Sequence, residues 1–432
     1  MGKFTLNIKE MRITILLMLF VNVSIAQNNK FIVDALVNPK TKARVITVGG
    51  INSDMQGYTN EAIQRAVDVL PAEGGTVKMD PGQYKMMAPV RLPSNVKLMG
   101  SGPGTVLKRI DGFHTKFIVD ADFGELKLTV EDASGFAVGM SIQVTTDVSS
   151  SCWDVTTGVI TDIVDNVLYI DTHLIRDYIS KDNGKVTNAG SCVSVLGSEN
   201  VTISDFAIDG NKDKNDLLDG CNGGGIVILK SKNVTVENVL VKDFNGEGIT
   251  WQITENVTVR NCEISGCTNM GMHPGTGSPN SLIENNNSHD NRVGLFICWR
   301  VQHSIIRGNQ LHHNREIGIS TGHKDSDVLF EKNHVFENGE DGVYFRDEDE
   351  KNSPHRNTFI NNTVENNGAI KGGYGFLFSG KALDVVLKDN IIRDTKKGTQ
   401  KAAIFISKNT PPIKEENNKM SGHALGNVIV EK

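Results

Sequence analysis

Short apolar stretches recur at a nearly constant interval through the second half of the chain. Each stretch begins at a glycine, and successive glycines lie 23, 23, 23, 24, 24 and 33 residues apart. A second stretch of the NVTVEN type follows each of them. Apolar and polar residues alternate within both stretches, which is the pattern of a β-strand with one buried face. The glycines are Gly225, Gly248, Gly271, Gly294, Gly318, Gly342 and Gly375.

This interval is too short for a strand–helix–strand unit or a propeller blade. It suits a coil that adds one strand to each of several parallel sheets, with successive coils about 4.8 Å apart. We therefore predict an all-β fold, a right-handed parallel β-helix, with coils repeating from about residue 198 to 408. Asparagines at the turn after the second strand are expected to stack in one column. They are Asn238, Asn261, Asn285, Asn309, Asn333, Asn362 and Asn390.

Three parts of the chain depart from the repeat. Thr59 or Asn60 is expected to cap an N-terminal helix that covers the open hydrophobic end of the coils. Residues 115–190 lose the repeat and predict a small antiparallel β insertion, which either forms a wall of a groove or decorates one edge. The final LGNVIV segment is expected to close the carboxy end. Residues 27–432 are thus predicted to form one β-helix domain with an insertion.

The amino terminus has the pattern of an export signal. Lys3, Lys9 and Arg12 precede an apolar run of about 11 residues, and small residues follow up to Ala26. A run of this length is shorter than the roughly 20 residues that a bilayer requires. We therefore predict a signal peptide over residues 1–26, a secreted or periplasmic location and no membrane span.

Composition limits the fold classes and the kinds of partner that the chain can have. Hydrophobic residues make up 38% and aromatic residues 6% of the chain, beside 43 glycines, which leaves too few large side chains for several globular cores. The net charge of 45 − 51 = −6 argues against nucleic-acid binding through phosphate neutralisation. None of the 6 cysteines is in a C-x-x-C pair, so no zinc site is predicted. A Cys152–Cys192 disulfide and separate buried thiols are open alternatives.

Two blocks of sequence resemble a known superfamily. The segments GGTVKMDPGQYKM and VRLPSNVKLMGSGPGTVLKR, within about residues 45–110, and the later ENVTISDFAIDGN are similar to the pectate-lyase superfamily of β-helical proteins. That superfamily includes polygalacturonases and mannuronan C5-epimerases, so the resemblance implies a carbohydrate-active protein. The Asp-Pro-His-Glu motif of the epimerases is missing from this sequence, as are the Gly-His-Gly and Arg-Ile-Lys motifs of the polygalacturonases.

The second and fourth residues after each glycine are expected to point to solvent and to form a long face. Aromatic rings on such a face stack on sugar rings, and a basic ladder on an acidic protein favours an anionic polysaccharide or oligosaccharide. The predicted substrate-binding residues on this face are Gln252, Trp299, Arg300, Lys324, Asp347 and Lys381.

The preferred chemistry on this face is β-elimination in a uronate-containing polysaccharide. This reaction needs a base, a proton donor to the leaving oxygen, and positive charge beside the carboxylate. Tyr344 with His323 or His273 is the candidate acid–base pair, and Arg346 is the candidate for neutralising the carboxylate, with Lys324 as the alternative.

Two other functions and a possible metal site stay open. Glycoside hydrolysis needs two carboxyl groups, for which Glu316, Glu340 and Asp341 are the candidates. A non-catalytic carbohydrate-binding β-helix would need neither set of catalytic residues. Oxygen-rich loops at residues 209–219 and 347–349 leave a Ca2+ site open as well.

Overall fold

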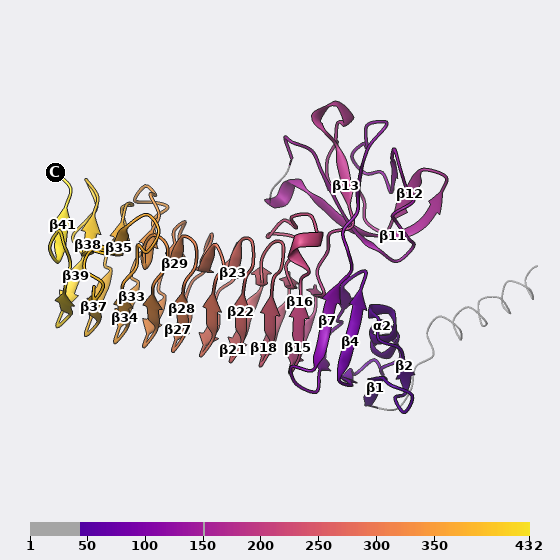
Figure 1. The fold of residues 1–432 in the computed structure, drawn as a ribbon, viewed down its shortest axis with the longest axis horizontal. Helices are drawn as coiled ribbons and strands as arrows, with labels where there is room; N and C mark the ends of the chain where they lie inside the picture. Colours follow the sequence, from indigo (N-terminus) through magenta and orange to yellow (C-terminus); the bar gives the residue numbers. More distant parts are fainter. Residues whose placement is uncertain (1–43, 150–151) are drawn as a thin grey trace, which may run out of the picture.

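The main body of the molecule is a stack of coils. The computed structural model describes residues 44–149 and 152–432. Three parallel sheets run along the stack, and each coil passes through sheets A, B and C in turn (Figure 1). The structure thus confirms the predicted parallel β-helix. It also adds a short third strand to each coil, in sheet B, which the two-stretch repeat did not predict.

Sheet A contains 13 strands. In spatial order they are β2 (Met55–Gln56), β1 (Val45–Gly49), β3 (Gly75–Met79), β6 (Val96–Met99), β15 (Glu199–Ser204), β18 (Lys232–Glu237), β21 (Glu255–Arg260), β24 (Leu282–Glu284), β27 (Ile305–Arg307), β30 (Leu329–Glu331), β33 (Thr358–Ile360), β36 (Val386–Lys388) and β39 (Lys414–Glu416).

Sheet B contains 11 strands. In spatial order they are β4 (Gly82–Met86), β7 (Thr105–Arg109), β16 (Ala207–Asp209), β19 (Leu240–Lys242), β22 (Glu263–Ser265), β25 (Asn287–His289), β28 (Gln310–His312), β31 (His334–Phe336), β34 (Thr363–Glu365), β37 (Ile391–Arg393) and β40 (Lys419–Ser421).

Sheet C contains 11 strands and carries the glycine-led stretches. In spatial order they are β41 (Val428–Val430), β38 (Gln400–Ile406), β35 (Gly373–Phe378), β32 (Val343–Phe345), β29 (Ile317–Thr321), β26 (Val293–Phe296), β23 (Met270–Gly275), β20 (Ile249–Gln252), β17 (Ile226–Leu229), β14 (Val193–Leu196) and β5 (Val90–Arg91). β41 lies in the predicted LGNVIV segment, but its Val428 and Val430 side chains are exposed.

The core is narrow because each strand contributes only one or two inward side chains. In sheet C the first residue after each glycine stacks on its equivalent in the next coil. This column is buried along its whole length. Its members are Ile226, Ile249, Met272, Leu295, Ile319, Val343 and Phe376, and Ile404, which follows Ala403, continues the column.

Helix α2 (Asn60–Asp68) lies beside the first coil, as predicted. The Thr59 hydroxyl caps it by accepting the backbone N–H of Ala62 at 3.3 Å. Its apolar face, which includes Ile63, Ala66 and Val67, is buried in the same core as the coils. The helix therefore protects apolar surface that the end of the stack would otherwise expose to water.

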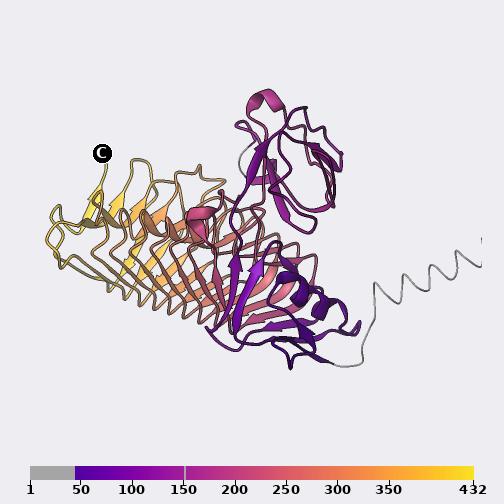
Figure 2. The same cartoon turned by 45° about the vertical axis from the view of Figure 1, so that its right-hand side comes forward.

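The predicted insertion forms a six-stranded antiparallel sheet with a core of its own. It projects from the amino-terminal coils on the side of sheet C (Figures 1 and 2). Its strands are β8 (His114–Lys116), β9 (Lys127–Thr129), β10 (Ser141–Thr145), β11 (Thr156–Val164), β12 (Val167–Ile170) and β13 (Lys185–Thr187).

Two buried side chains hold the insertion to the coils. The Arg109 guanidinium donates to the backbone carbonyls of Met86, on the coils, and Asn188, beside the insertion. The Asn188 carboxamide in turn accepts the backbone N–H of Phe113 and donates to the carbonyl of Asp111. Burial lowers the pKa of Arg109, so its charge depends on these carbonyl acceptors.

The predicted asparagine column is wrong at its first three members. Asn238, Asn261 and Asn285 have left-handed backbone φ angles of 55°, 53° and 56° and lie one position earlier, at the turn. The buried ladder begins one residue after Asn285. It consists of Asn286, Asn309, Asn333, Asn362, Asn390 and Asn418, and each side chain hydrogen-bonds to the next.

A second amide ladder follows the corner between sheets B and C. It contains Asn314, Asn338, Asn367 and Gln400, again linked side chain to side chain. At both corners the amide oxygens also accept backbone N–H groups of the preceding coil. The ladders therefore satisfy buried backbone groups where the chain leaves the sheets.

Three further predictions concern a disulfide, the signal peptide and a membrane span. Cys192 is a buried free thiol, so the Cys152–Cys192 alternative is not formed. The predicted signal peptide, residues 1–26, lies outside the described residues. Within residues 44–149 and 152–432, no helix is both long and apolar enough to cross a membrane.

Loss of one ladder amide should destabilise the fold. Asn362 donates to the Phe330 carbonyl and to Asn390, and its oxygen accepts two N–H groups of Asn333. We expect Asn362→Ala to lower the free energy of unfolding by about 3 kcal/mol, because several buried polar groups lose their partner. Denaturant unfolding monitored by circular dichroism measures this loss. Asn361→Gly, which keeps the adjacent left-handed turn, is the matched control and should change stability little.

A histidine stack on sheet B should make stability fall in acid. The ring of His312 lies 4.9 Å from His289 and 4.5 Å from Phe336. Burial and the neighbouring His289 and His313 lower the pKa of His312 from its usual 6.5 to about 4. The neutral ring is therefore favoured by folding, and its stabilising contribution is lost as the pH falls from 6.5 toward 4.

We expect His312→Phe, which keeps an aromatic ring in the stack, to reduce this acid sensitivity. Thermal melts of the variant and the parent protein at about pH 7 and about pH 4.5 measure it. An equal fall in Tm for both proteins would contradict the assignment to His312.

Candidate functional site

The candidate site lies on the outer face of sheet C. The strand register aligns Thr250 with His273, and Phe296 with Ser320 and Tyr344. This is the predicted outward column. The face runs along the same side of the molecule from which the insertion projects (Figure 1).

The amino-terminal part of this face is covered. A loop at residues 217–223 crosses it, and the Gly220 carbonyl accepts a hydrogen bond from the Thr250 hydroxyl at 2.9 Å. The insertion holds this loop, because the Gln143 side chain donates to the Leu217 carbonyl and accepts the backbone N–H of Asp219. Thr250 and the predicted substrate contact Gln252 are fully buried, so Gln252 has no surface that a substrate could touch in this structure.

Glu247 and His273 form a buried ion pair beneath this loop. Nδ1 of His273 donates to the Glu247 carboxylate at 2.8 Å, and the two side chains are 6% and 4% exposed. Burial alone would lower the pKa of His273, but the Glu247 charge and hydrogen bonds from Glu247 and Cys298 outweigh it and raise the pKa to about 10. His273 is therefore an imidazolium at neutral pH, and it cannot act as the general base predicted as one alternative.

Two glycines in the second outward column make room for long polar side chains. A Cβ atom at Gly275 would lie 2.3 Å from Oε1 of Gln252, and one at Gly322 would lie 2.4 Å from Nε of Arg346. Gln252 and Arg346 therefore lie across the sheet, over these glycines. The isolated bridge between Gly275 and Cys298 places Cys298 in the same column, between them.

Arg346 is held in this position from several sides. Its guanidinium donates to the Ser320 hydroxyl and to the Ile297 carbonyl, each at 2.9 Å, and lies 4.6 Å above the Phe296 ring centre. Its Nη2 lies 3.5 Å from Asp325. The pKa of Asp325 is raised to about 7 by complete burial, which outweighs the opposing effect of Arg346.

The exposed rim of the face carries the predicted substrate-binding residues. Trp299 is 47% exposed, and its ring lies 5.2 Å from that of His323, whose Nδ1 is 3.4 Å from Glu348. Arg300, Lys324 and Lys381 form no ion pair among the residues that the structure describes. The predicted contact Asp347 is exposed beside Arg346 and would repel a bound carboxylate.

The three carboxylates predicted for hydrolysis lie together at the opposite end of these strands. The Glu340 N–H donates to the Glu316 carbonyl, which confirms that the two residues occupy equivalent positions in adjacent coils. Each is paired with a cation: Glu316 with Arg292 at 3.3 Å, and Glu340 with Lys371 at 2.5 Å.

Asp341 is the carboxylate of this group with the altered acidity. It accepts the backbone N–H of Tyr374, but burial is the larger effect and raises its pKa to about 6, with a contribution from Glu340. Four residues of extended chain separate Glu340 from Tyr344, or about 13 Å. The structure therefore separates the two predicted catalytic groups.

The predicted calcium loops use their carboxylates in other ways. Asp209 pairs with Lys108, and Asp216 pairs with His114. Asp349 accepts the backbone N–H of Asn352. Among the described residues there is no group of three or more His, Cys, Asp or Glu side chains placed to hold a metal ion.

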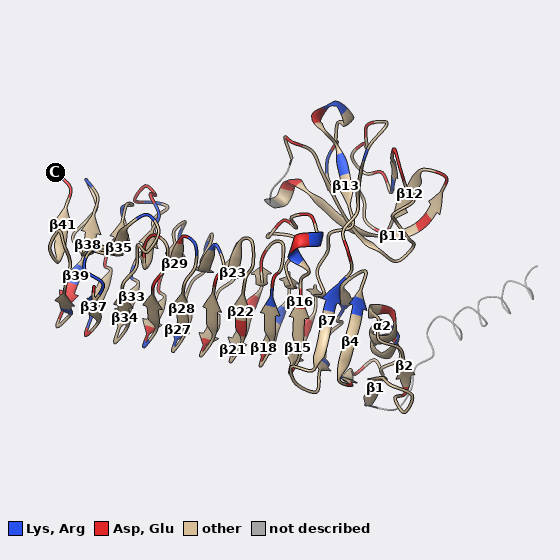
Figure 3. Ribbon diagram, viewed as in Figure 1, with Lys and Arg blue, Asp and Glu red and all other residues tan. Residues whose placement is uncertain are grey.

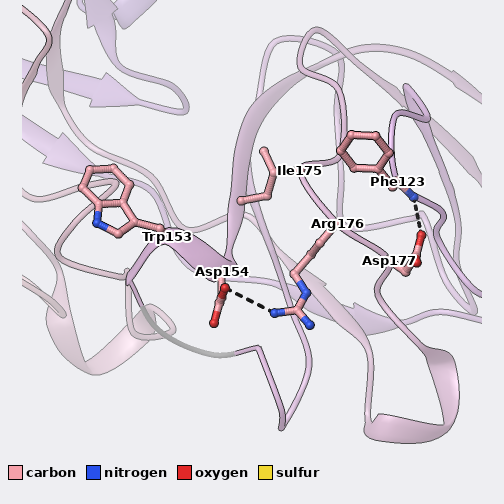
Figure 4. A pocket seen from close by; sticks show the side chains of 6 residues that line it. All are labelled: Phe123, Trp153, Asp154, Ile175, Arg176 and Asp177. Atoms are coloured by element: carbon pink, nitrogen blue, oxygen red, sulfur yellow. Dashed lines mark hydrogen bonds and ion pairs between the residues drawn. The ribbon is translucent and has the colours of Figure 1, made fainter.

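Two hollows lie away from the predicted residues. An open pocket of about 460 Å3 in the insertion is lined by Phe123, Trp153 and Ile175 and by the Arg176–Asp154 ion pair (Figure 4). A smaller cleft of about 130 Å3 lies where the insertion meets the first strands of sheet C. Neither hollow contains a residue proposed for catalysis.

Sequence reasoning did not place Glu247 or Asp325 in the site, where they pair with His273 and Arg346. A signal for Glu247 was present, because it occupies a position that is apolar in the following coils. Glycines at positions 275 and 322 were a second signal, since a missing side chain in an outward column leaves room for a neighbour. No repeat pattern indicated Asp325, which lies in the loop after β29.

Comparisons with known proteins concern mainly the coils. Residues 191–359 match a family model described as a right handed beta helix region. No curated protein matches the sequence. Among solved structures, the chain is similar to the A-module of a mannuronan C-5 epimerase from Azotobacter vinelandii, with 16% identity and a TM-score of 0.54 over 86% of this chain and 93% of that chain.

Two further structures are similar to the same degree. The polygalacturonase from Erwinia carotovora has 16% identity and a TM-score of 0.54 over 91% of this chain and 98% of that chain. The surface protein and adhesin PfbA of Streptococcus pneumoniae has 14% identity and a TM-score of 0.54 over 86% and 96%. Identities this low establish the fold and leave the reaction open. The chain is a right-handed parallel β-helix, as the family model and these three structures agree.

Proposed function

We propose that this protein is a polysaccharide-active enzyme that cleaves an acidic polysaccharide along the outer face of sheet C. The observation that carries the proposal is a set of three cations on this face, Arg300, Lys324 and Lys381, that form no ion pair with a described residue. The exposed Trp299 lies on the same face. Focused positive charge attracts and orients anions, and the aromatic ring offers a sugar a stacking surface.

Cations elsewhere on the coils differ from Arg300, Lys324 and Lys381, because many of them form ion pairs. Both signs of charge are spread along the stack (Figure 3). On sheets A and B, and at their corners, many cations are paired with a carboxylate of an adjacent coil. The pairs include Arg260–Glu237, Arg307–Glu284, Arg356–Asp327, Lys388–Glu416 and Arg393–Glu365.

β-Elimination is the reaction that the described side chains support best. Arg346 is preorganised by Ser320 and the Ile297 carbonyl, so it can stabilise charge that develops on a uronate carboxylate without rearranging. Tyr344 lies two residues before Arg346, about 7 Å along the chain. We assign Tyr344 and His323 to proton transfer and Lys324 to binding the carboxylate.

Hydrolysis is the second candidate, and Asp341 favours it. A carboxyl group with a pKa of about 6 is suited to donate a proton to a glycosidic oxygen near neutral pH. Glu340 or Glu316 would then supply the second carboxylate. The ion pairs of both glutamates and the burial of Asp341 place this chemistry second.

We also propose that the protein acts outside the cytoplasm. The basic residues and short apolar run of residues 1–26 support export. A polymeric glycan substrate is consistent with that location.

Tyr344→Phe distinguishes β-elimination from hydrolysis and from binding without catalysis. On an acidic glycan that the parent protein cleaves, we expect the rate of absorbance increase from unsaturated uronate ends to fall at least about a hundredfold, since proton transfer is lost. Tyr169→Phe, at an exposed tyrosine of the insertion, is the control and should keep full activity. New reducing ends without this absorbance, abolished by Asp341→Asn, would instead establish hydrolysis. Binding without any product across a panel of acidic glycans would establish a non-catalytic binding protein.

Lys324→Ala tests whether positive charge on the exposed rim of sheet C binds the acidic glycan. We expect KM for the acidic glycan to rise about three- to tenfold with little change in kcat, and the salt dependence of KM to weaken, because one carboxylate contact is removed. Lys332→Ala, on the surface near sheet A, is the matched control. Equal effects of the two substitutions would contradict a specific role for the rim.

A further inference from the structure

The hollow of about 460 Å3 in the insertion combines exposed apolar side chains with charged ones. Phe123 is 69% exposed, Ile175 is 45% exposed and Trp153 is 38% exposed. Figure 4 shows Ile175 and Arg176 between the rings of Trp153 and Phe123. Large apolar side chains that gather in water around one hollow are typical of a binding surface. The residues that line the hollow are Phe123, Trp153, Asp154, Ile175, Arg176 and Asp177.

The hollow is built from three segments that hydrogen bonds hold together. The buried hydroxyls of Thr156 and Tyr178 lie 2.8 Å apart. Thr156 accepts the Ile175 N–H at 3.1 Å, and Tyr178 donates to the Asp154 carbonyl at 3.2 Å, so two of the segments are joined. Backbone pairing of Ala121 with Tyr178 holds the third, which carries Phe123. The hollow is therefore preformed, and a ligand that enters it orders little of the chain.

The charged side chains of the hollow are accessible as donors and acceptors. Nη1 of Arg176 lies 3.3 Å from Asp154, yet these side chains are 40% and 59% exposed. Asp177 accepts the Phe123 N–H at 2.7 Å through Oδ1. An ionised carboxylate only accepts hydrogen bonds and a guanidinium only donates them, whereas a hydroxyl group does both. A ligand with several hydroxyl groups can therefore bond to both kinds of side chain at once.

We propose that this hollow binds a neutral sugar unit of a glycan, at a site distinct from the outer face of sheet C. A pyranose ring has an apolar face of C–H bonds, which packs on the aromatic side chains, and hydroxyl groups around its edge for Arg176 and the two aspartates. The lining carries two carboxylates and one guanidinium, so a uronate is repelled here. The proposal does not depend on cleavage of an acidic polysaccharide at the rim.

Titration calorimetry with neutral oligosaccharides tests the proposal. The probes are linear β-1,4-linked oligosaccharides of glucose, mannose, galactose, xylose and N-acetylglucosamine. We expect at least one of them to bind, and Trp153→Ala to weaken that binding at least about tenfold because the main stacking surface is lost. Tyr169→Ala is the matched control, since Tyr169 is an equally exposed aromatic residue of the insertion outside the hollow. Thermal melts of both variants verify that the fold is retained.

Three results would overturn the proposal. The first is that none of the neutral oligosaccharides binds. The second is that their binding survives Trp153→Ala but is lost in Trp299→Ala, which would place the sugar on the rim of sheet C. The third is that proline-rich peptides bind through Trp153 and the oligosaccharides do not, which would identify a protein partner.

Arg176→Ala tests the polar side of the hollow. We expect the affinity for the bound oligosaccharide to fall about tenfold, because charged hydrogen bonds to hydroxyl groups are lost. Lys181→Ala, at an exposed lysine of the insertion outside the hollow, removes the same charge and should leave the affinity unchanged. Equal losses in the two variants would overturn the role of Arg176 in direct binding.

Cleavage assays distinguish this site from the site of the proposed reaction. On a short acidic oligosaccharide that the parent protein cleaves, we expect Trp153→Ala to keep the parent values of kcat and KM. Calorimetry requires no catalysis, so a protein that cleaves nothing would still bind the neutral oligosaccharide if the hollow is a sugar site. A large loss of kcat in Trp153→Ala would overturn the assignment of the hollow as a distinct binding site.

Discussion

Backbone hydrogen bonding between successive coils is the constraint on which the rest of the structure depends. Each strand in the coil stack satisfies its polar groups only through the coils before and after it, so equivalent residues are brought into columns. Where the chain turns between sheets this pairing stops. The buried amides of Asn333 and Asn362 take it over, since one carboxamide can accept from the coil before and donate to the coil after. A change in coil length must therefore lie outside these corners.

The same stacking explains how charged groups are kept on the face of sheet C. A buried charge is costly unless it is paired and hydrogen-bonded. His273 is paired with Glu247, and Arg346 is paired with Asp325, in each case across the coils. The glycines at 275 and 322 allow long side chains to lie flat over the sheet and reach a neighbouring strand. The face is thus preorganised electrostatically before any ligand is present.

The two parts of this face differ in their access to solvent. Its amino-terminal portion is covered, because the insertion and the loop at residues 217–223 hold Glu247 and His273 away from water. Arg300, Lys324 and Lys381, which have no ion pair among the described residues, lie on its exposed rim. Arg346 lies between the two regions and can contribute positive charge to both.

The sequence by itself determined the repeat, and through it the fold. Period-two alternation at 23–24-residue spacing predicted parallel coils, and the Thr59 cap and the antiparallel insertion were also predictable, because each depends on local pattern. It also identified the column that contains His273 and Tyr344. The sequence could not show which asparagine begins the ladder, since Asn285 and Asn286 differ only in backbone conformation.

Which outward residues are accessible was decided only by tertiary structure. Gln252 is buried because a loop and an insertion distant in sequence cover it, and Arg346 meets the Ile297 carbonyl and Ser320 because separate coils stack. Contacts between coils depend on the direction of each side chain and on the space that glycines leave. The sequence of a single repeat specifies neither of these.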